Sequence, residues 1–165
     1  MNTDKKADMT GISVLMQLES MARNAETPKA LQFIMANETR KLVNYRQAFV
    51  FSADNITKRL HNLECASSVA IVDDHAPLTT WLEKLVSNLH AASGKSSIQQ
   101  IDIVSCPEKF RAKWKQYSLP FVLFCPLSLP NGKHIGVLLL ARETPWQENE
   151  IALVKRLSET YAHAW

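Results

Sequence analysis

Three cysteines, Cys65, Cys106 and Cys125, have the widest chemical repertoire of the side chains in this sequence. Thiol catalysis needs a reactive thiolate and a second thiol that can resolve a sulfenic acid. The intervals are 41 residues from 65 to 106 and 19 residues from 106 to 125, and no C-x-x-C pair occurs. Cys125 lies within an apolar run, where a thiol is inert, so we expect Cys106 alone to be exposed. This spacing indicates free thiols in a reducing compartment rather than a disulfide framework or a zinc ribbon.

Acidic and histidine side chains raise the question of a metal site. The run Asp73-Asp74-His75 offers possible ligands, but the nearby Pro77 favours another role, a carboxylate that caps the start of a helix. The remaining histidines have no partner at ligand spacing, so each is expected to be a surface or hydrogen-bonded residue. They are His61, His90, His134 and His163. The sequence therefore predicts neither a metal site nor a cofactor.

Basic and aromatic residues alternate over residues 109–117, a combination that can bind single-stranded nucleic acid. The basic residues are Lys109, Arg111, Lys113 and Lys115, and the aromatic ones are Phe110, Trp114 and Tyr117. The aromatic positions fall at helical spacing, so they point one way while the cations fan out into solvent. We expect an amphipathic helix and no nucleic-acid partner, with an acidic ligand above the basic face as the remaining alternative.

Size and composition define the broad class of protein. The chain has 165 residues, of which 46% are apolar and 21% charged, and its net charge is +3. These values suit one soluble domain with a sizeable core and demand neither a nucleic acid nor a membrane as partner. Four unclustered glycines exclude a P-loop and a dinucleotide fingerprint. Neither a signal peptide nor an apolar run of about 20 residues is visible, so we expect a cytoplasmic location.

Hydrophobic periodicity predicts both helices and strands. Spacings of three and four residues indicate helices over residues 12–25, 28–42, 77–93, 108–117 and 147–165. Strands are expected at residues 48–53, 66–72, 98–104, 121–129 and 134–142, and the polar segment 54–64 is expected to be turn-like. Residues 1–11 are polar and are predicted to be a disordered tail, ahead of a single domain over residues 12–165.

The last two predicted strands determine the expected architecture. Asn131-Gly132 lies between two apolar runs, which is the strongest short signal for a β-hairpin. Both runs are almost continuously apolar, whereas the strands of a sheet with one wet face would alternate. Helices must therefore cover both faces of an antiparallel sheet, and the predicted fold class is α+β.

A hairpin that runs into a long C-terminal helix resembles the end of a GAF domain. The stretches that carry the resemblance are LQFIMANETRKLVNYRQAFVFSA and LPFVLFCPLSLPNGKHIGVLLLARETPWQENEIALVKRLSETYAHAW. Gly136-Val137-Leu138-Leu139-Leu140 and Glu148-Asn149-Glu150 match the family's apolar strand and acidic helix start. The resemblance covers residues 12–165. It implies an antiparallel GAF-like sheet of five or six strands, with the terminal helices on one face and residues 74–118 covering the other.

A narrower resemblance concerns three short stretches. NETR, YRQA and the final PW…YAHAW are similar to a GAF-like segment at the front of bacterial membrane-fusion proteins of the HlyD-type secretion adaptor group. The last predicted helix also stops at Trp165 without a C-cap glycine or tail, which favours a chain that continues further. The resemblance thus implies a cytoplasmic module attached to, or associated with, a secretion adaptor.

GAF domains that bind ligands do so between the sheet and its second cover. By the resemblance, the pocket residues are Phe51, Trp81, Trp114, Tyr117, Leu123 and Cys125. A small-molecule cavity and a filled core both remain open, because aromatic stripes on helices usually belong to a core. The N-K-x-x-D motif of cyclic-nucleotide GAF domains and the adjacent Cys-His pair of bilin-binding ones do not occur. The cysteine spacing also departs from that of the free methionine sulfoxide reductases, which place two cysteines close together in one loop.

Many GAF domains dimerise through their terminal helices, and these helices carry more apolar surface than one sheet face needs. The candidate dimer or partner surface is Leu15, Leu18, Ala22, Leu153, Tyr161 and Trp165. The alternative is that one core consumes both stripes. We therefore expect a non-enzymatic regulatory or sensory module, dimeric, that binds a small molecule or a partner. A ligand-free interaction scaffold of a secretion system and a sulfoxide reductase are the alternatives.

Overall fold

The fold is built on one antiparallel sheet. The computed structural model describes residues 2–165 except 55, 57–59, 69–71 and 94–96, with side chains from Thr10 onward except those of Ser93 and Ser105. The strands are β1 (Gln47–Ala53), β2 (His61–Ala66), β3 (Gln99–Ile101), β4 (Phe121–Ser128) and β5 (His134–Arg142). They lie in the order β2-β1-β5-β4-β3, and every neighbouring pair is antiparallel.

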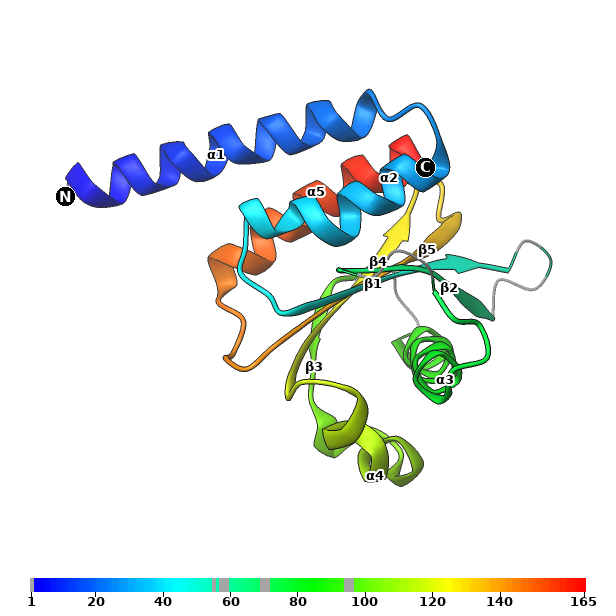
Figure 1. Ribbon diagram of the computed structural model, residues 1–165. Coiled ribbons are helices and arrows are strands. Elements are labelled where there is room, and N and C mark those ends of the chain that lie inside the picture. Colours follow the sequence, from blue (N-terminus) through cyan, green and yellow to red (C-terminus); the bar gives the residue numbers. More distant parts are fainter. Residues whose placement is uncertain (1, 55, 57–59, 69–71, 94–96) are drawn as a thin grey trace.

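Helices cover both faces of this sheet. They are α1 (Asn2–Arg23), α2 (Pro28–Phe33), α3 (Pro77–Ser93), α4 (Glu108–Tyr117) and α5 (Glu148–Ala164), and α2 continues into a π-helical and a 3-10 turn over residues 34–41. Helices α1, α2 and α5 lie on one face, and α3 and α4 lie on the other (Figure 1). The predicted α+β class and the predicted division of helices between the faces are confirmed.

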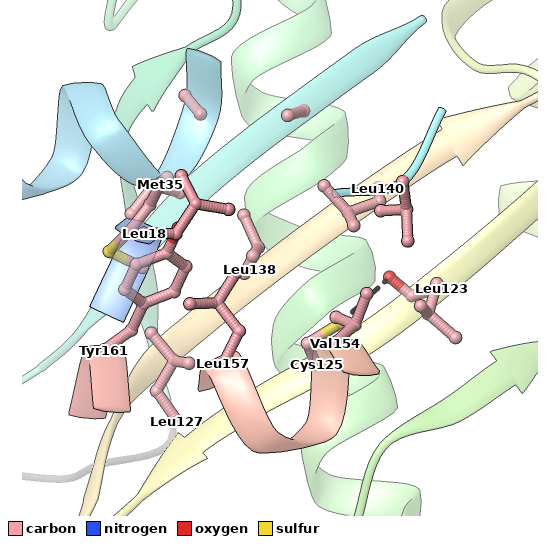
Figure 2. Close-up of a cluster of buried hydrophobic side chains, with 14 of the residues drawn as sticks. Leu18, Met35, Leu123, Cys125, Leu127, Leu138, Leu140, Val154, Leu157 and Tyr161 are labelled. Carbon is pink, nitrogen blue, oxygen red and sulfur yellow. Dashed lines mark hydrogen bonds between the residues drawn. The ribbon is translucent and has the colours of Figure 1, made fainter. Parts of the chain in front are cut away.

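Each face of the sheet has its own hydrophobic core. Along β4, Leu123 and Cys125 enter the core beneath α1 and α5, which Figure 2 shows from close by. Val122 and Phe124 enter the other core, beneath α3 and α4. Successive side chains of a strand point to opposite faces, so a strand buried on both faces must be apolar at every position. The continuous apolar runs of the hairpin have this cause.

Local signals in the sequence set several element boundaries. Thr27 caps α2, its Oγ1 accepting from the backbone N–H of Ala30 at 3.1 Å, and Pro28 opens the helix. Gly132 takes a φ of +86° in the turn between β4 and β5, a conformation that favours glycine. Gln147 and Glu150 form a reciprocal capping box at the start of α5.

The prediction for the second strand was wrong. The strand β2 (His61–Ala66) lies mostly in the segment that was expected to be turn-like, whereas the predicted strand 66–72 includes residues 69–71, outside the described residues. His61 and Leu63 are buried while Asn62 and Glu64 are exposed. β2 is an edge strand with one face in solvent, so buried and exposed residues alternate along it. In so short a strand, the polar residues make this alternation hard to recognise in the sequence.

The start of α1 and the role of Asp73 before α3 differ from the predictions, whereas α3 itself begins at Pro77 as expected. A helix was expected from residue 12, but α1 begins at Asn2, in a polar stretch without proline or glycine before residue 11. The division into a tail over 1–11 and a domain over 12–165 stays a prediction. At α3 the Asp73 carboxylate accepts from the backbone N–H of His75 at 3.0 Å, so it closes the turn before the helix instead of capping the helix itself. None of the described helices has the length and hydropathy to cross a membrane.

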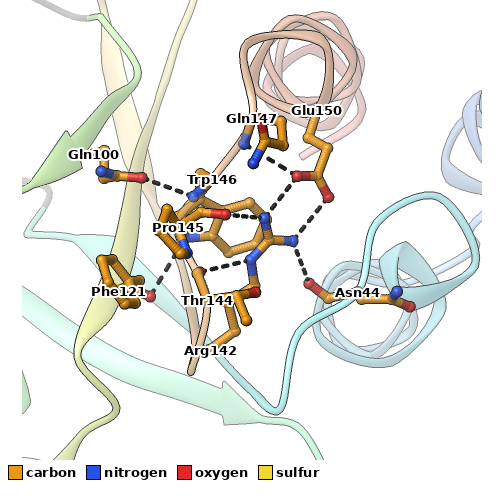
Figure 3. A network of polar contacts seen from close by, with 9 residues as sticks. All are labelled: Asn44, Gln100, Phe121, Arg142, Thr144, Pro145, Trp146, Gln147 and Glu150. Carbon is orange, nitrogen blue, oxygen red and sulfur yellow. Dashed lines mark hydrogen bonds and ion pairs between the residues drawn. The ribbon is translucent and has the colours of Figure 1, made fainter.

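Arg142 joins three segments of the fold at the end of β5 (Figure 3). Its guanidinium makes a two-pronged ion pair with Glu150 of α5, with N···O distances of 2.6 and 2.8 Å. The same group donates to three backbone carbonyl oxygens at 2.6–3.0 Å, and its Cζ atom lies 3.9 Å from the centre of the Trp146 ring. The three carbonyls belong to Asn44, Thr144 and Pro145. The start of α5 is thereby held against the sheet.

Candidate ligand-binding cleft

A cleft of about 510 Å³ opens between α3 and α4, on the face of the sheet where the second cover was expected. Its walls come from one side of each helix, because residues three and four apart share a helix face. The lining residues are Pro77, Thr80, Trp81 and Lys84 of α3 and Lys109, Phe110, Lys113 and Tyr117 of α4.

The floor of the cleft is aromatic. The Trp81 ring lies 5.5 Å from the ring of Tyr117 and 6.4 Å from that of Phe110, measured between ring centres. Beneath it, Trp114 meets Trp81 edge to face at 5.8 Å and donates its indole N–H to the carbonyl oxygen of Leu119 at 2.9 Å. The indole N–H of Trp81 is buried, and no hydrogen-bond acceptor for it lies among the described residues. Such a donor is costly unless something else accepts from it.

The rim of the cleft is cationic. Lys84, Lys109 and Lys113 line it and are exposed, and none of them forms an ion pair within the part of the chain that the structure describes. The Lys109 ammonium lies 5.1 Å from the centre of the Phe110 ring. A planar apolar floor below like charges favours a flat anionic molecule, since stacking and charge attraction then act on the same ligand.

The six predicted pocket residues do not lie together. Phe51, Trp81, Trp114 and Tyr117 belong to the core under α3 and α4, whereas Leu123 and Cys125 face the opposite core. Successive residues of a strand face opposite sides of the sheet. The prediction chose the β4 residues that face α1 and α5 instead of those that face α3 and α4. Phe51 and Trp114 are fully buried, so the space between the sheet and this cover is filled by side chains. Of the six residues, Trp81 and Tyr117 line the cleft.

The predicted dimer surface is largely inside the monomer. Leu15, Leu18, Ala22 and Tyr161 are buried in the core between α1, α5 and the sheet, and the Tyr161 hydroxyl lies 2.7 Å from Thr39 Oγ1. Leu153 and Trp165 are half-buried against the same core. Most of the apolar residues of α1 and α5 therefore belong to one core within the monomer, as the alternative to a dimer surface predicted. Two other apolar side chains of α1 are exposed instead, Ile12 at 53% and Met16 at 61%.

The cysteines are not arranged for thiol catalysis. Cys106 is buried, contrary to the prediction that it alone would be exposed, and Cys65 is half-buried. Cys65 and Cys125 pack on the core beneath α1 and α5, whereas Cys106 belongs to the core on the other side of the sheet. Burial raises the pKa of all three thiols, which disfavours the thiolate. The arrangement therefore gives no support to the reductase alternative.

Sequence reasoning missed one cluster entirely. His61, His90 and His134 were each expected to be a surface or hydrogen-bonded residue without a ligand partner, but one ring nitrogen of each lies within 4.8 Å of the others. They come from β2, α3 and β5, so no spacing along the chain reveals them. Only the positions of two of these residues could have indicated the cluster: His61 and His134 are each the first residue of a strand that pairs with β1. His75 and His163 are exposed.

Comparison with known proteins gives a fold rather than a close relative. No protein-family model and no curated protein sequence matches this chain. Among solved structures, the phycoerythrobilin-bound GAF domain of a cyanobacterial phytochrome matches with a TM-score of 0.69 and 11% identity over 93% of each chain. Residues 122 to 287 of a methyl-accepting chemotaxis protein match with a TM-score of 0.65 and 14% identity, over 89% of this chain and 93% of that one. A GAF domain of the Acinetobacter phosphoenolpyruvate-protein phosphotransferase also gives 0.65 and 14%, over 93% and 90%.

These similarities identify the fold. The chain has the fold of GAF domains, with a five-stranded antiparallel sheet covered on both faces by helices. The neighbours named above come from a phytochrome, a chemotaxis protein and a phosphotransferase, so the fold occurs in several different proteins.

Proposed function

We propose that this chain is a regulatory or sensory module of GAF type, without a catalytic step of its own, that binds a small, flat, anionic molecule in the cleft between α3 and α4. The observation that carries the proposal is the joint arrangement of an aromatic floor, Trp81 with Tyr117, and a rim of three exposed lysines.

The filled interior limits the size of the ligand. A phytochrome neighbour carries a bound phycoerythrobilin. Here the residues between the sheet and α3 are packed, with Phe51, Leu82 and Leu85 all fully buried. A cleft of about 510 Å³ on the outer side suits a smaller molecule with one or two charged groups.

Binding of anilinonaphthalene sulfonate, a flat anionic fluorescent probe, tests the cleft directly. We expect one probe per chain, with quenching of tryptophan fluorescence because Trp81 lies in the floor. Lys113→Gln is expected to weaken binding about tenfold, since a hydrogen bond to a charged group contributes about 1.5 kcal/mol or more. Lys115→Gln is the matched control, an exposed lysine of α4 outside the cleft. Equal affinities for the two variants, or no saturable binding to the wild-type chain, would rule the cleft out.

A ligand-free interaction scaffold is the second candidate. The packed space between the sheet and the α3–α4 cover favours it, because a scaffold needs a surface and no cavity. The probe experiment separates the two: the scaffold predicts no difference between Lys113→Gln and the wild-type chain.

We further propose that the module dimerises through the outer face of α1. Ile12 and Met16 lie four residues apart, and therefore on one side of the helix, and both are more than half exposed. Met16→Lys is expected to shift the chain from dimer to monomer in light scattering coupled to size exclusion. Gln17→Lys, at an exposed position of the same helix, is expected to leave the mass unchanged. A monomeric wild-type chain at micromolar concentration would contradict this proposal.

Coupling to a secretion adaptor is a proposal supported by the NETR, YRQA and PW…YAHAW resemblance alone. In that arrangement the module stands on the cytoplasmic side and passes its ligand state on through α1 and α5, which pack against each other. Reading the gene beyond the codon for Trp165 tests the attached form: a membrane-spanning run and a coiled-coil segment are expected there. An immediate stop codon would eliminate it.

A further inference from the structure

Three histidine side chains meet at one end of the sheet, beside the last turn of α3. His61 Nε2 lies 2.8 Å from His134 Nε2, and the rings of His90 and His134 stack with their centres 3.9 Å apart. The His61 ring meets the other two edge to face at 5.1 and 5.2 Å. His61 and His134 are buried and His90 is half-buried. Three imidazole rings, each with a nitrogen that can bind a metal ion, therefore lie close together.

The sheet topology explains how these residues meet. β1 lies between β2 and β5, and both neighbours run antiparallel to it. His61 opens β2 opposite Ala53, the last residue of β1, and His134 opens β5 on the other side of the same strand end. His90 comes from the last turn of α3, which packs on this face of the sheet. Two strands and one helix therefore deliver one ring each.

Two serine hydroxyls orient the buried rings. Ser87 Oγ lies 3.2 Å from His61 Nδ1, and Ser128 Oγ lies 3.4 Å from His134 Nδ1. With Nδ1 of each ring engaged by a hydroxyl, Nε2 of each ring is directed at the other. A hydrogen-bonded histidine whose second nitrogen faces a shared point is the usual arrangement around a metal ion, where the outer partner sets the tautomer and the ring orientation.

Burial disfavours the charged form of two of the three rings, those of His61 and His90. Burial, together with the nearby His90, lowers the pKa of His61 to about 4, and burial also lowers the pKa of His90. A neutral imidazole offers a lone pair, whereas an imidazolium cannot bind a cation.

We propose that His61, His90 and His134 form a binding site for one divalent transition-metal ion of the Zn²⁺ class, with a fourth coordination position left open. Imidazole ligands suit Zn²⁺ and its neighbours, whereas Ca²⁺ and Mg²⁺ require oxygen donors. Three protein ligands and one open position are the pattern of zinc sites that take up a water molecule or a small anion. The site is separate from the α3–α4 cleft: none of its residues lines that cleft.

Coordination requires the His90 and His134 rings to turn out of their stacked arrangement, because the in-plane lone pairs of two nearly parallel rings do not converge on one ion. A tetrahedral Zn²⁺ with bonds of about 2.0–2.1 Å holds its nitrogens about 3.3 Å apart. The ring nitrogens already lie within 4.8 Å of one another, and the closest pair must separate slightly from 2.8 Å. In the bound form both Nδ1 atoms carry a proton and donate to the serine hydroxyls, and both Nε2 lone pairs face the ion.

Co²⁺ is the probe that tests the site, because its visible absorption reports both coordination number and ligand type. The full chain, stripped with a chelator, is expected to bind one Co²⁺ with an intense visible band of a four-coordinate nitrogen site, and Zn²⁺ is expected to displace it. His134→Gln is expected to weaken binding by more than about 100-fold, and Ser87→Ala by about tenfold, because outer partners of metal ligands are typically worth 10–100-fold in affinity. His163→Gln and His75→Gln, at exposed positions, are expected to change nothing.

Several outcomes would overturn the proposal. They are no saturable binding of either ion, equal loss in His134→Gln and His163→Gln, and an ultraviolet thiolate-to-cobalt band that assigns the ion to Cys65, the partly exposed thiol. Ser87→Ala keeps the experiment decisive if His134→Gln does not fold, since it leaves all three ligands in place. If His134→Gln does not fold, an unchanged affinity in a folded Ser87→Ala would overturn the assignment of the ion to these histidines. The fluorescent-probe titration of the cleft does not depend on this site, so either proposal can fail alone.

Discussion

Replacing Arg142 by methionine is expected to lower the free energy of unfolding by about 4 kcal/mol, the largest effect among the substitutions considered. Methionine retains much of the length and apolar contact of the arginine stem but supplies no donor. The change leaves the Glu150 carboxylate without its buried partner and removes the donor from three backbone carbonyls. Because these groups are partly buried, they regain only part of the lost interaction from water.

The matched control is Arg46→Met. Arg46 pairs with Glu143 nearby on the surface, but its side chain is 67% exposed, whereas that of Arg142 is 8% exposed. An exposed pair contributes less than about 1 kcal/mol, so this variant should unfold at nearly the wild-type denaturant concentration. Chemical denaturation of the two variants measures the difference. A similar loss in both would mean that the Arg142 network is no more stabilising than a surface ion pair.

The acid dependence of stability identifies the origin of the Arg142 effect. The hydrogen bond from Arg142 holds the pKa of Glu150 below its usual value of 4.5. A carboxyl with a depressed pKa in the folded state contributes stability above its unfolded pKa, and loses it as the pH falls through the folded pKa. The gap between wild type and Arg142→Met is therefore expected to be full near neutral pH and to narrow as the pH falls below about 4.5. A gap that stays constant across this range would place the loss in packing alone.

Gly136→Ala is expected to lower the free energy of unfolding by about 3 kcal/mol. A methyl group on Gly136 would collide with the backbone carbonyl oxygen of Phe51 on the neighbouring strand and approach the Trp165 ring at 3.3 Å. A flexible side chain could move aside, but the carbonyl belongs to the backbone of β1, an interior strand of the sheet. The strands must separate locally, and the ladder between β1 and β5 weakens there.

Gly11→Ala provides the control, because the same atom is added where nothing lies within 4 Å. Gly11 lies within α1, and alanine in a helix interior is more favourable than glycine by about 0.5 to 1 kcal/mol. The two variants are thus expected to change stability in opposite directions in the same thermal or chemical melt. Loss of stability in Gly11→Ala, or none in Gly136→Ala, would contradict the close contact described here.

Much of the fold was predictable because it depends on local patterns. The hairpin from β4 to β5 follows from two apolar runs around Asn131-Gly132, and the start of α2 follows from Thr27-Pro28. Coverage of both sheet faces follows from the absence of alternation in β4 and β5. These features rest on neighbours within a few residues, whose preferences any chain segment expresses by itself.

The candidate sites were less accessible to such reasoning. Leu123 and Cys125 were assigned to the pocket, but they face the opposite core. The sequence of a strand shows which residues share a face, but not which group of helices covers that face. β2 was missed because its exposed polar residues obscured the two-residue period.

By itself, therefore, the sequence determined the elements of the hairpin and terminal helices, the two-faced sheet and the absence of the phosphate-binding glycine motifs. Only the tertiary structure decided that Leu15, Leu18 and Tyr161 are buried and that an aromatic, lysine-rimmed cleft lies outside a filled core. It alone also brought His61, His90 and His134 together. The physical reason is the same in each case. Burial and contact between residues far apart in the chain depend on strand order and register, which no local preference encodes.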